Sequence, residues 1–168
     1  MEPHIELLTQ IEVQYMMKNI AYSNAAHVTF CRFGPTAYAL RLTDKMSRYE
    51  NLLTHPDIDG NDESIDDTLR DAINYVLMWA ADMYVGSDDE SNDDNVRKTT
   101  EYIRDLACNT YANLCEMGED FKRQWLQDGK MLSDVPYEMY EQEVPLPHYI
   151  EFASYLVMLY VDRRKEDD

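Results

Sequence analysis

The residues best suited to chemistry are the acidic side chains of DESIDDTLRDAINY, residues 62–75. In a helix, successive side chains are about 100° apart, so four oxygen-bearing side chains of this segment share an arc of roughly 80°. They are Glu63, Asp67, Asp71 and Asn74. Mg²⁺ prefers such oxygens, together with phosphate and water. The stripe also lies nearly opposite the apolar stripe of the same helix, so a metal site and a solvated face are both open interpretations.

A basic stripe precedes these acids, in the segment RLTDKMSRYENLL, residues 41–53. Arg41, Lys45 and Arg48 fall on one helical face beside an apolar seam. In a chain this acidic, three cations close in sequence to a carboxylate stripe suggest a phosphate clamp that faces a metal site. Salt bridges between the two helices are the alternative interpretation of the same residues.

Apolar residues recur at helical spacing along most of the chain, and no alternating strand pattern of useful length stands out. This pattern predicts an all-α bundle of about five helices. The expected helices span about residues 4–20, 35–53, 61–86, 95–126 with a break at Gly118, and 148–161. Residues 21–35 fit either a loop or a short helix. A loop is expected over residues 128–147, and the charged tail 162–168 is expected to fray.

A chain of 168 residues is long enough for one domain with its own core. Within that domain, the sequence suggests a helical core over residues 1–86, an acidic loop over 87–95 and a helical extension over 96–168. Asn61 or Asp62 is the expected N-cap of the acidic helix, which also places acids in its first turn.

The net charge of −18 comes from 33 acidic and 15 basic residues. Such a field repels nucleic acid and anionic membrane surfaces, so direct binding to either is not expected. It suits a protein that holds cations, docks on a basic protein or stays soluble. The N-terminus has no basic, apolar leader pattern, and no apolar run reaches about eighteen residues. The sequence therefore predicts a cytoplasmic protein.

Cysteine and histidine offer little at the level of sequence. Three cysteines follow no pairing or zinc-site spacing, so reduced thiols are expected. Cys108 and Cys115 are seven residues apart on one helical face and are predicted to be small core residues. The four histidines show neither HxxxH nor HxH spacing, and no cysteine has an obvious partner. Neither a histidine metal site nor a nucleophilic triad is predicted.

Two segments together resemble a protein family found in phages and prophages, the nucleotide modification associated domain 1 family. RLTDKMSRYENLL (41–53) and DESIDDTLRDAINYVLM (62–78) correspond to its RLxDKxxRxxNL and ESxxDTxxDxxNY helices. Upstream, KNIAYSNAAHVTFCRFGP matches a K-N-x-D-Y-G-like segment that leads to Phe-Gly; the matching positions are Lys18, Asn19, Tyr22, Phe33 and Gly34. The chain departs from that segment at Ala21 and Ser23. The resemblance covers about residues 15–84.

That family is similar to the all-α nucleotide pyrophosphohydrolases of the MazG type, which bind Mg²⁺ and a nucleoside triphosphate. The resemblance therefore implies a MazG-like core over residues 1–86, followed by the acidic loop and the C-terminal helical extension. The resemblance implies Mg²⁺ as cofactor, with Glu63, Asp67 and Asp71 as metal-binding and catalytic residues. It implies ligand contacts from Lys18, Tyr22, Arg41, Lys45, Arg48 and Asn74. The implied reaction is attack of water on the α–β phosphoanhydride, in a homodimer within the host cytoplasm. Ala21 and a missing ExxE pair leave nucleotide binding without hydrolysis as an alternative.

An interaction protein is the rival class. A small acidic chain of phage type also fits an inhibitor that binds a basic host defence or nucleic-acid-processing protein, with carboxylates in place of phosphates. The acidic loop and the C-terminal half favour this class. Exposed aromatics in YEMYEQEVPLPHY, residues 137–149, could serve a subunit interface or pack on the bundle.

Overall fold

A computed structural model describes residues 2–21, 25–55, 64–85, 93–126 and 130–167. Over these ranges the fold is all-α and contains no strand. Eight α-helices follow one another: α1 (Pro3–Ala21), α2 (Ala25–Phe33), α3 (Thr36–Thr54), α4 (Ile65–Ala80), α5 (Asp93–Cys115), α6 (Glu119–Trp125), α7 (Val135–Gln142) and α8 (Leu146–Asp167). A π-helical turn, η1 (Ala81–Val85), extends α4, and a 3₁₀ turn, η2 (Leu132–Asp134), precedes α7.

Helix α4 begins where the sequence offers a side-chain cap. The Ser64 hydroxyl accepts a hydrogen bond from the Asp67 backbone N–H at 3.0 Å, and Asp66 and Asp67 lie in the first turn, where the helix dipole favours acids. The predicted caps, Asn61 and Asp62, lie outside the described residues. The inward side of α4 is almost completely buried, and this burial is the main source of its stability. Its fully enclosed side chains include Leu69, Ile73, Val76 and Trp79.

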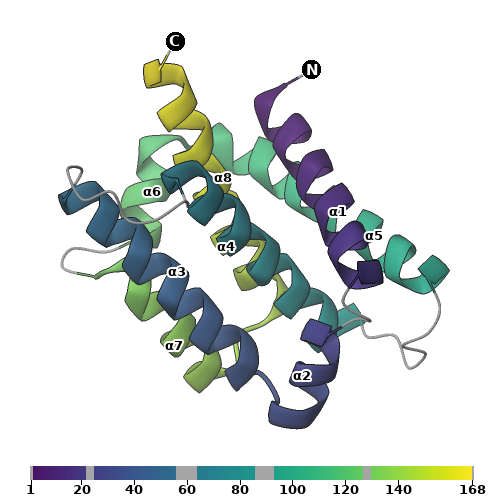
Figure 1. Ribbon diagram of the computed structural model, residues 1–168. Helices are drawn as coiled ribbons and strands as arrows, with labels where there is room; N and C mark the ends of the chain where they lie inside the picture. The colour runs from purple at the N-terminus through teal and green to yellow at the C-terminus, as the bar shows by residue number, and fades with distance from the viewer. Residues whose placement is uncertain (1, 22–24, 56–63, 86–92, 127–129, 168) are drawn as a thin grey trace.

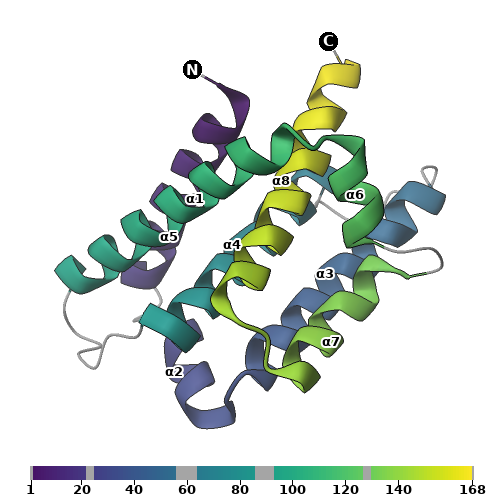
Figure 2. The ribbon, with the colours of Figure 1, turned by 180° about the vertical axis from the view of Figure 1, so that it is seen from behind.

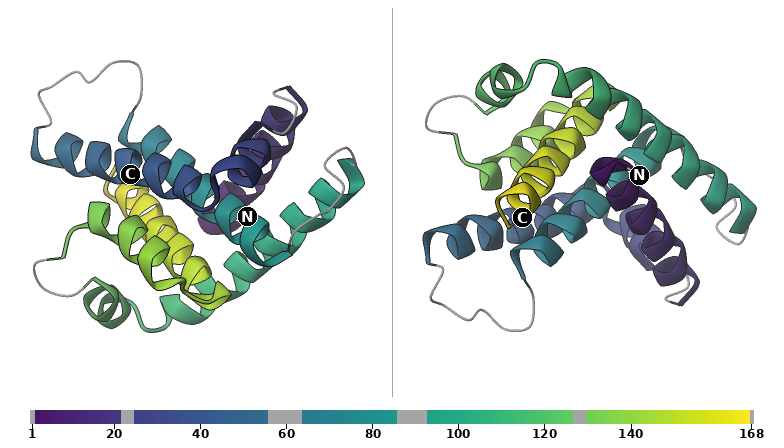
Figure 3. Two further views of the ribbon diagram at one scale, coloured as in Figure 1. Left: turned by 90° about the horizontal axis from the view of Figure 1, so that it is seen from below. Right: turned by 90° about the horizontal axis from the view of Figure 1, so that it is seen from above.

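The core forms where α4 packs against α3 on one side and α8 on another (Figure 1). α8 carries a long buried run that includes Phe152, Leu156 and Val157, and it also packs against α5, as the reverse view shows (Figure 2). α1 packs mainly on α5, and seen end-on these two helices lie on one side of the molecule while α3 and α7 lie on the other (Figure 3). The beginning of α1 and the end of α8 lie at the same end of the molecule (Figure 1).

The helix count of about five was too low, and three segments explain the difference. The 21–35 segment contains α2, which the sequence left undecided. The segment 128–147, predicted as a loop, contains η2 and α7. Its prolines suggested a break, but Pro136 lies in the first turn of α7, where a missing N–H does no harm, and is buried with Val135 and Met139. The break at Gly118 separates α5 from α6 as two helices.

The charged tail, which was expected to fray, is helical through Asp167, and ion pairs to other helices contact its first residues. Helix α8 runs to Asp167. Arg163 Nε lies 3.3 Å from one oxygen of Asp66 at the start of α4, and Arg164 Nη1 lies 3.5 Å from the other. Lys122 of α6 forms an ion pair with Asp162. None of the helices in the described ranges has the length and apolar character needed to cross a bilayer.

Candidate functional site

The charged face comprises Arg41, Lys45 and Arg48 of α3 and Asp67, Asp71 and Tyr75 of α4. Its two helices meet at an ion pair: Lys45 Nζ lies 3.0 Å from Asp71 Oδ2. One turn away, the Arg41 guanidinium lies over the Tyr75 ring, 5.7 Å from its centroid, which is within cation–π range. The sequence-predicted basic and acidic stripes therefore do face each other across these helices.

The other predicted residues of the two helices differ in exposure and in the elements beside them. Asp67 is exposed in the first turn of α4, and Arg48 is partly buried on α3, three residues beyond Lys45. Asn74 lines a small, mainly apolar hollow between α1, α4 and α5, beside Ile11 and Ile103. Asn74 thus borders the side of α4 that faces α1 and α5, whereas Asp71 contacts Lys45 of α3.

Three of the predicted residues cannot be located by side chain. Glu63 and Tyr22 lie outside the described residues, as does the side chain of Lys18. Because α4 begins at Ile65, the described part of the acidic stripe starts at Asp67 and contains two carboxylates. In the described part of the chain, no three His, Cys, Asp or Glu side chains come together in a way that could hold a metal ion. Two carboxylates still suit Mg²⁺ when phosphate and water complete its shell.

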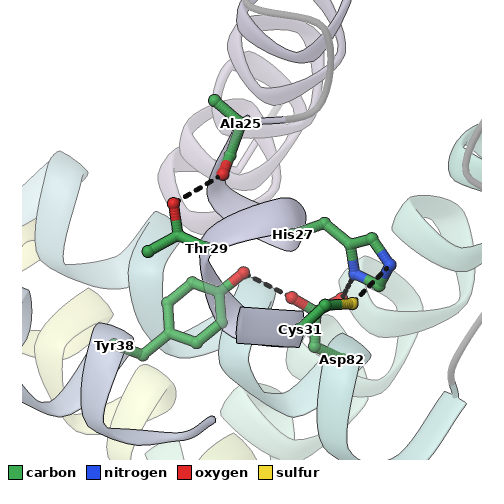
Figure 4. Close-up of polar contacts among 6 residues, drawn as sticks. All are labelled: Ala25, His27, Thr29, Cys31, Tyr38 and Asp82. Atoms are coloured by element: carbon green, nitrogen blue, oxygen red, sulfur yellow. Dashed lines mark hydrogen bonds and ion pairs between the residues drawn. The ribbon is translucent and has the colours of Figure 1, made fainter. Parts of the chain in front are cut away.

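A second polar arrangement lies where α2, α3 and η1 meet, and the sequence did not predict it. We call His27, Cys31, Tyr38 and Asp82 the thiol cluster (Figure 4). Cys31 Sγ lies 3.5 Å from His27 Nε2, and His27 Nδ1 lies 2.7 Å from Asp82 Oδ1. The Tyr38 hydroxyl donates a hydrogen bond to the other oxygen of Asp82, Oδ2. A thiol, an imidazole and a carboxylate thus stand in a row, with the imidazole between the other two.

The hydrogen bonds define the roles of the two imidazole nitrogens. An ionised carboxylate only accepts, so His27 Nδ1 carries the proton that it shares with Asp82. In a neutral ring Nε2 is then an acceptor, and the Cys31 thiol is its donor. This is the order of groups in nucleophile–base–carboxylate arrangements, where the carboxylate fixes the base and the base takes the nucleophile's proton.

Buried aromatic packing holds Tyr38 and therefore Asp82 in place. Tyr38 is 1% exposed and lies against Phe30, with ring centroids 5.8 Å apart. Its other neighbour is Trp79, stacked at 6.4 Å and fully buried. Trp79 in turn meets Tyr149 of α8 edge-on at 5.1 Å. The Tyr38 and Asp82 end of the thiol cluster is thus packed against the core, while Cys31 is exposed.

Local backbone geometry brings the four residues together. His27 and Cys31 are four residues apart on α2, which places them on one face one turn apart. Asp82 lies in the π-helical turn η1, which adds a residue per turn and changes the direction in which side chains leave α4; such turns occur often at functional sites. Gly34, at φ +69°, makes the corner between α2 and α3 and brings Tyr38 back toward α2.

One signal for this cluster was present in the sequence. The i, i+4 spacing of His27 and Cys31 is informative only if residues 25–33 are helical, and the sequence pattern there fits a loop as well as a helix. The predicted core position of Cys115 was wrong: Cys115 is exposed and Cys108 is partly buried, because the inward face of α5 is formed by Ile103, Ala107 and Tyr111.

No protein-family model, no curated protein and no solved structure matches this chain.

Proposed function

We propose that the chain binds a nucleoside triphosphate at the charged face, through its phosphates and with Mg²⁺. The observation that carries the proposal is the contact between Lys45 and Asp71, 3.0 Å apart, with side chains 21% and 33% exposed. A cation and a carboxylate that meet at a partly open surface offer both halves of a metal–phosphate site. Lys45 suits a phosphate oxygen, and Asp71 suits the metal that bridges to it.

The neighbouring residues support the same assignment. Asp67 is one helical turn before Asp71 on α4, so the two carboxylates would hold Mg²⁺ together. Arg41 and Arg48 extend the cationic side along α3. The partly exposed Tyr75 ring, already beneath Arg41, could stack on a base. Bound Mg²⁺ would stabilise negative charge on the phosphates, as hydrolysis of the α–β phosphoanhydride requires.

Calorimetric titration tests the proposal directly. The protein is titrated with the common ribo- and deoxyribonucleoside triphosphates, once with Mg²⁺ and once with EDTA. We expect binding in the presence of Mg²⁺. The affinity should fall by at least about tenfold in Asp67→Ala and in Asp71→Asn, because each variant loses one contact to a charged group. Asp44→Ala is the matched control, since Asp44 is an exposed acid of α3 next to Lys45. Pyrophosphate release in the same samples separates turnover from binding.

The outcomes distinguish the proposal from its rivals. Absence of heat with every nucleotide, from a protein that circular dichroism shows to be folded, overturns it. Equal nucleotide affinities of Asp44→Ala and Asp71→Asn also contradict the proposal, because the two acids would then affect binding only through the net charge. Metal-dependent binding without pyrophosphate release supports a nucleotide-binding protein that has no hydrolase activity.

A second candidate function is docking on a basic protein, and helix α7 favours it. α7 exposes Tyr137 and Tyr140, which are 60% and 41% exposed, beside the exposed acids Glu141 and Glu143. The Glu141 carboxylate, hydrogen-bonded to Tyr137, raises the pKa of that phenol. Tyrosine is enriched at protein interfaces, and the surrounding charge suits a cationic partner.

The docking candidate makes a separate prediction. Association with a basic partner should weaken with salt and with Tyr137→Ala, and should be unaffected by Asp71→Asn. Sedimentation at several protein concentrations identifies the other possible occupant of this face, a second copy of the chain. A strict requirement for Asp71 in partner binding would contradict docking through α7.

A further inference from the structure

We propose that Cys31 is a reactive nucleophile activated by His27, and that its substrates are hydroperoxides. The inference is independent of nucleotide binding, because the thiol cluster shares no residue with the charged face. It depends on three features of the described residues. The thiol is exposed, a base lies beside it, and a carboxylate holds that base.

The Cys31 thiol is accessible to a substrate and lies beside a base. Cys31 is exposed on α2, and its sulfur lies 3.5 Å from His27 Nε2, within hydrogen-bond range for sulfur. A thiol reacts as its thiolate, so a base that takes the proton raises the reactive fraction at neutral pH. The histidine side chain is only 16% exposed, which keeps the imidazole at the sulfur instead of free in solvent.

The positioning residues fix the direction of proton transfer. Asp82 accepts from His27 Nδ1 at 2.7 Å, and its side chain is 12% exposed. This contact leaves Nε2 facing Cys31 and stabilises the imidazolium that forms when the thiol loses its proton. Tyr38 holds the second oxygen of Asp82 from within the core, so the carboxylate cannot readily turn away. Asp82 and Tyr38 therefore act through His27 and do not touch the substrate.

A hydroperoxide suits this arrangement because its reaction needs a thiolate and one proton. The Cys31 proton passes to His27 Nε2, and the thiolate attacks the terminal peroxide oxygen. An S–O bond forms as the O–O bond breaks. The departing hydroxide, or alkoxide from an alkyl hydroperoxide, takes the proton from His27 and leaves as water or alcohol. Sulfur is oxidised by two electrons to the sulfenic acid, and the peroxide is reduced by two.

The chain contains its own controls, because its three cysteines differ in setting. Cys115 is exposed on α5 and Cys108 is partly buried there. Iodoacetamide labelling of the native protein at neutral pH, followed by mass spectrometry of each cysteine, compares all three in one sample. We expect Cys31 to react about tenfold faster than Cys115 or more, as an activated thiol should. Cys108 reports whether the fold stays closed.

Three variants test the residues around the thiol. In His27→Gln, the Cys31 rate should fall to within about twofold of the Cys115 rate, since the base is gone. Asp82→Asn and Tyr38→Phe should lower the Cys31 rate by smaller factors, with the Cys115 rate unchanged. A variant that merely loosened the fold would instead expose Cys108 and raise its rate. Equal rates at Cys31 and Cys115 in the native protein would overturn the proposal, as would a Cys31 rate that ignores His27→Gln.

Hydrogen peroxide is the probe for the substrate class. The native protein is treated with dilute hydrogen peroxide in the presence of dimedone, which traps sulfenic acids. The adduct is expected at Cys31, with little at Cys115, and the preference should disappear in His27→Gln. Equal trapping at Cys31 and Cys115, in a protein whose Cys31 is alkylated rapidly, would refute the hydroperoxide assignment. The nucleotide titration of Cys31→Ser shows whether the two sites are independent, since its affinity should match that of the native protein.

Discussion

The charged face and the thiol cluster differ in how firmly their acids are held. Asp71 meets Lys45 where the side chains are 33% and 21% exposed. Asp82 is 12% exposed and accepts from His27 on one oxygen and from Tyr38 on the other. A partly open ion pair exchanges partners at low cost, which suits ligand binding. A carboxylate held on both oxygens fixes a direction, which suits proton transfer.

The largest expected effect is on the element that supports both regions. Trp79 of α4 is fully buried between Tyr38 and Tyr149. Trp79→Ala should lower the free energy of unfolding by about 3–5 kcal/mol, because it removes a large side chain and leaves a cavity. Urea denaturation followed by circular dichroism measures it. The exposed Tyr102→Ala on α5 is the control, and an equal loss there would show that the Trp79 packing is not special.

A smaller loss should follow from breaking the thiol cluster alone. Tyr38→Phe keeps the aromatic packing and removes the hydroxyl that donates to Asp82. We expect the free energy of unfolding to fall by about 1.5–3 kcal/mol, the range for a hydrogen bond to a charged group. Tyr102→Phe should cost nothing measurable, since that side chain is 49% exposed. If the two variants were equally stable, Asp82 would not be held from within the core.

The corresponding contact at the charged face should be weaker. A double-mutant cycle with Lys45→Met and Asp71→Asn isolates its coupling energy. We expect about 0.2–1 kcal/mol, because both side chains remain partly in water, and a decrease with added salt. A salt-independent coupling larger than the effect of Tyr38→Phe would reverse the comparison between the two regions.

Part of this comparison was predictable from the sequence and part was not. The i, i+3 and i, i+4 spacings placed Arg41, Lys45 and Asp71 on facing helical surfaces, since local periodicity determines a helix face. Asp82 shows the limit. Its position depends on a π-helical turn after Ala80, and its partners come from positions 55 and 44 residues earlier in the chain. A one-residue change of helical register and long-range contacts leave no mark in periodicity.

Helix α7 and the end of α8 are two further places that local sequence patterns did not predict. The prolines of 136–147 suggested a loop, but burial against α3 makes a helix of α7. The tail of α8 is held by Asp66, an acid that lies outside the predicted stripe. In both places a tertiary contact decided a structure that local propensity left weak.

The smallest predicted effect concerns pH and lies outside both regions. Burial lowers the pKa of His148, against a weaker opposite effect of Glu151. The unfolded chain therefore binds a proton at higher pH than the folded chain does, so the stability contributed by neutral His148 is lost as pH falls below about 6.5. His148→Gln should flatten the acid side of the stability curve, measured by urea titrations. A curve parallel to that of the native protein would contradict this.

The most direct test of the thiol cluster is the protonation of His27. Long-range ¹H–¹⁵N correlation spectra of the labelled protein at neutral pH, assigned by comparison with His27→Gln, report which ring nitrogen carries hydrogen. We expect a proton on Nδ1, held by Asp82, whether or not Nε2 has accepted the proton of Cys31. An Nδ1 without a proton would contradict it, because the carboxylate could then not orient the base.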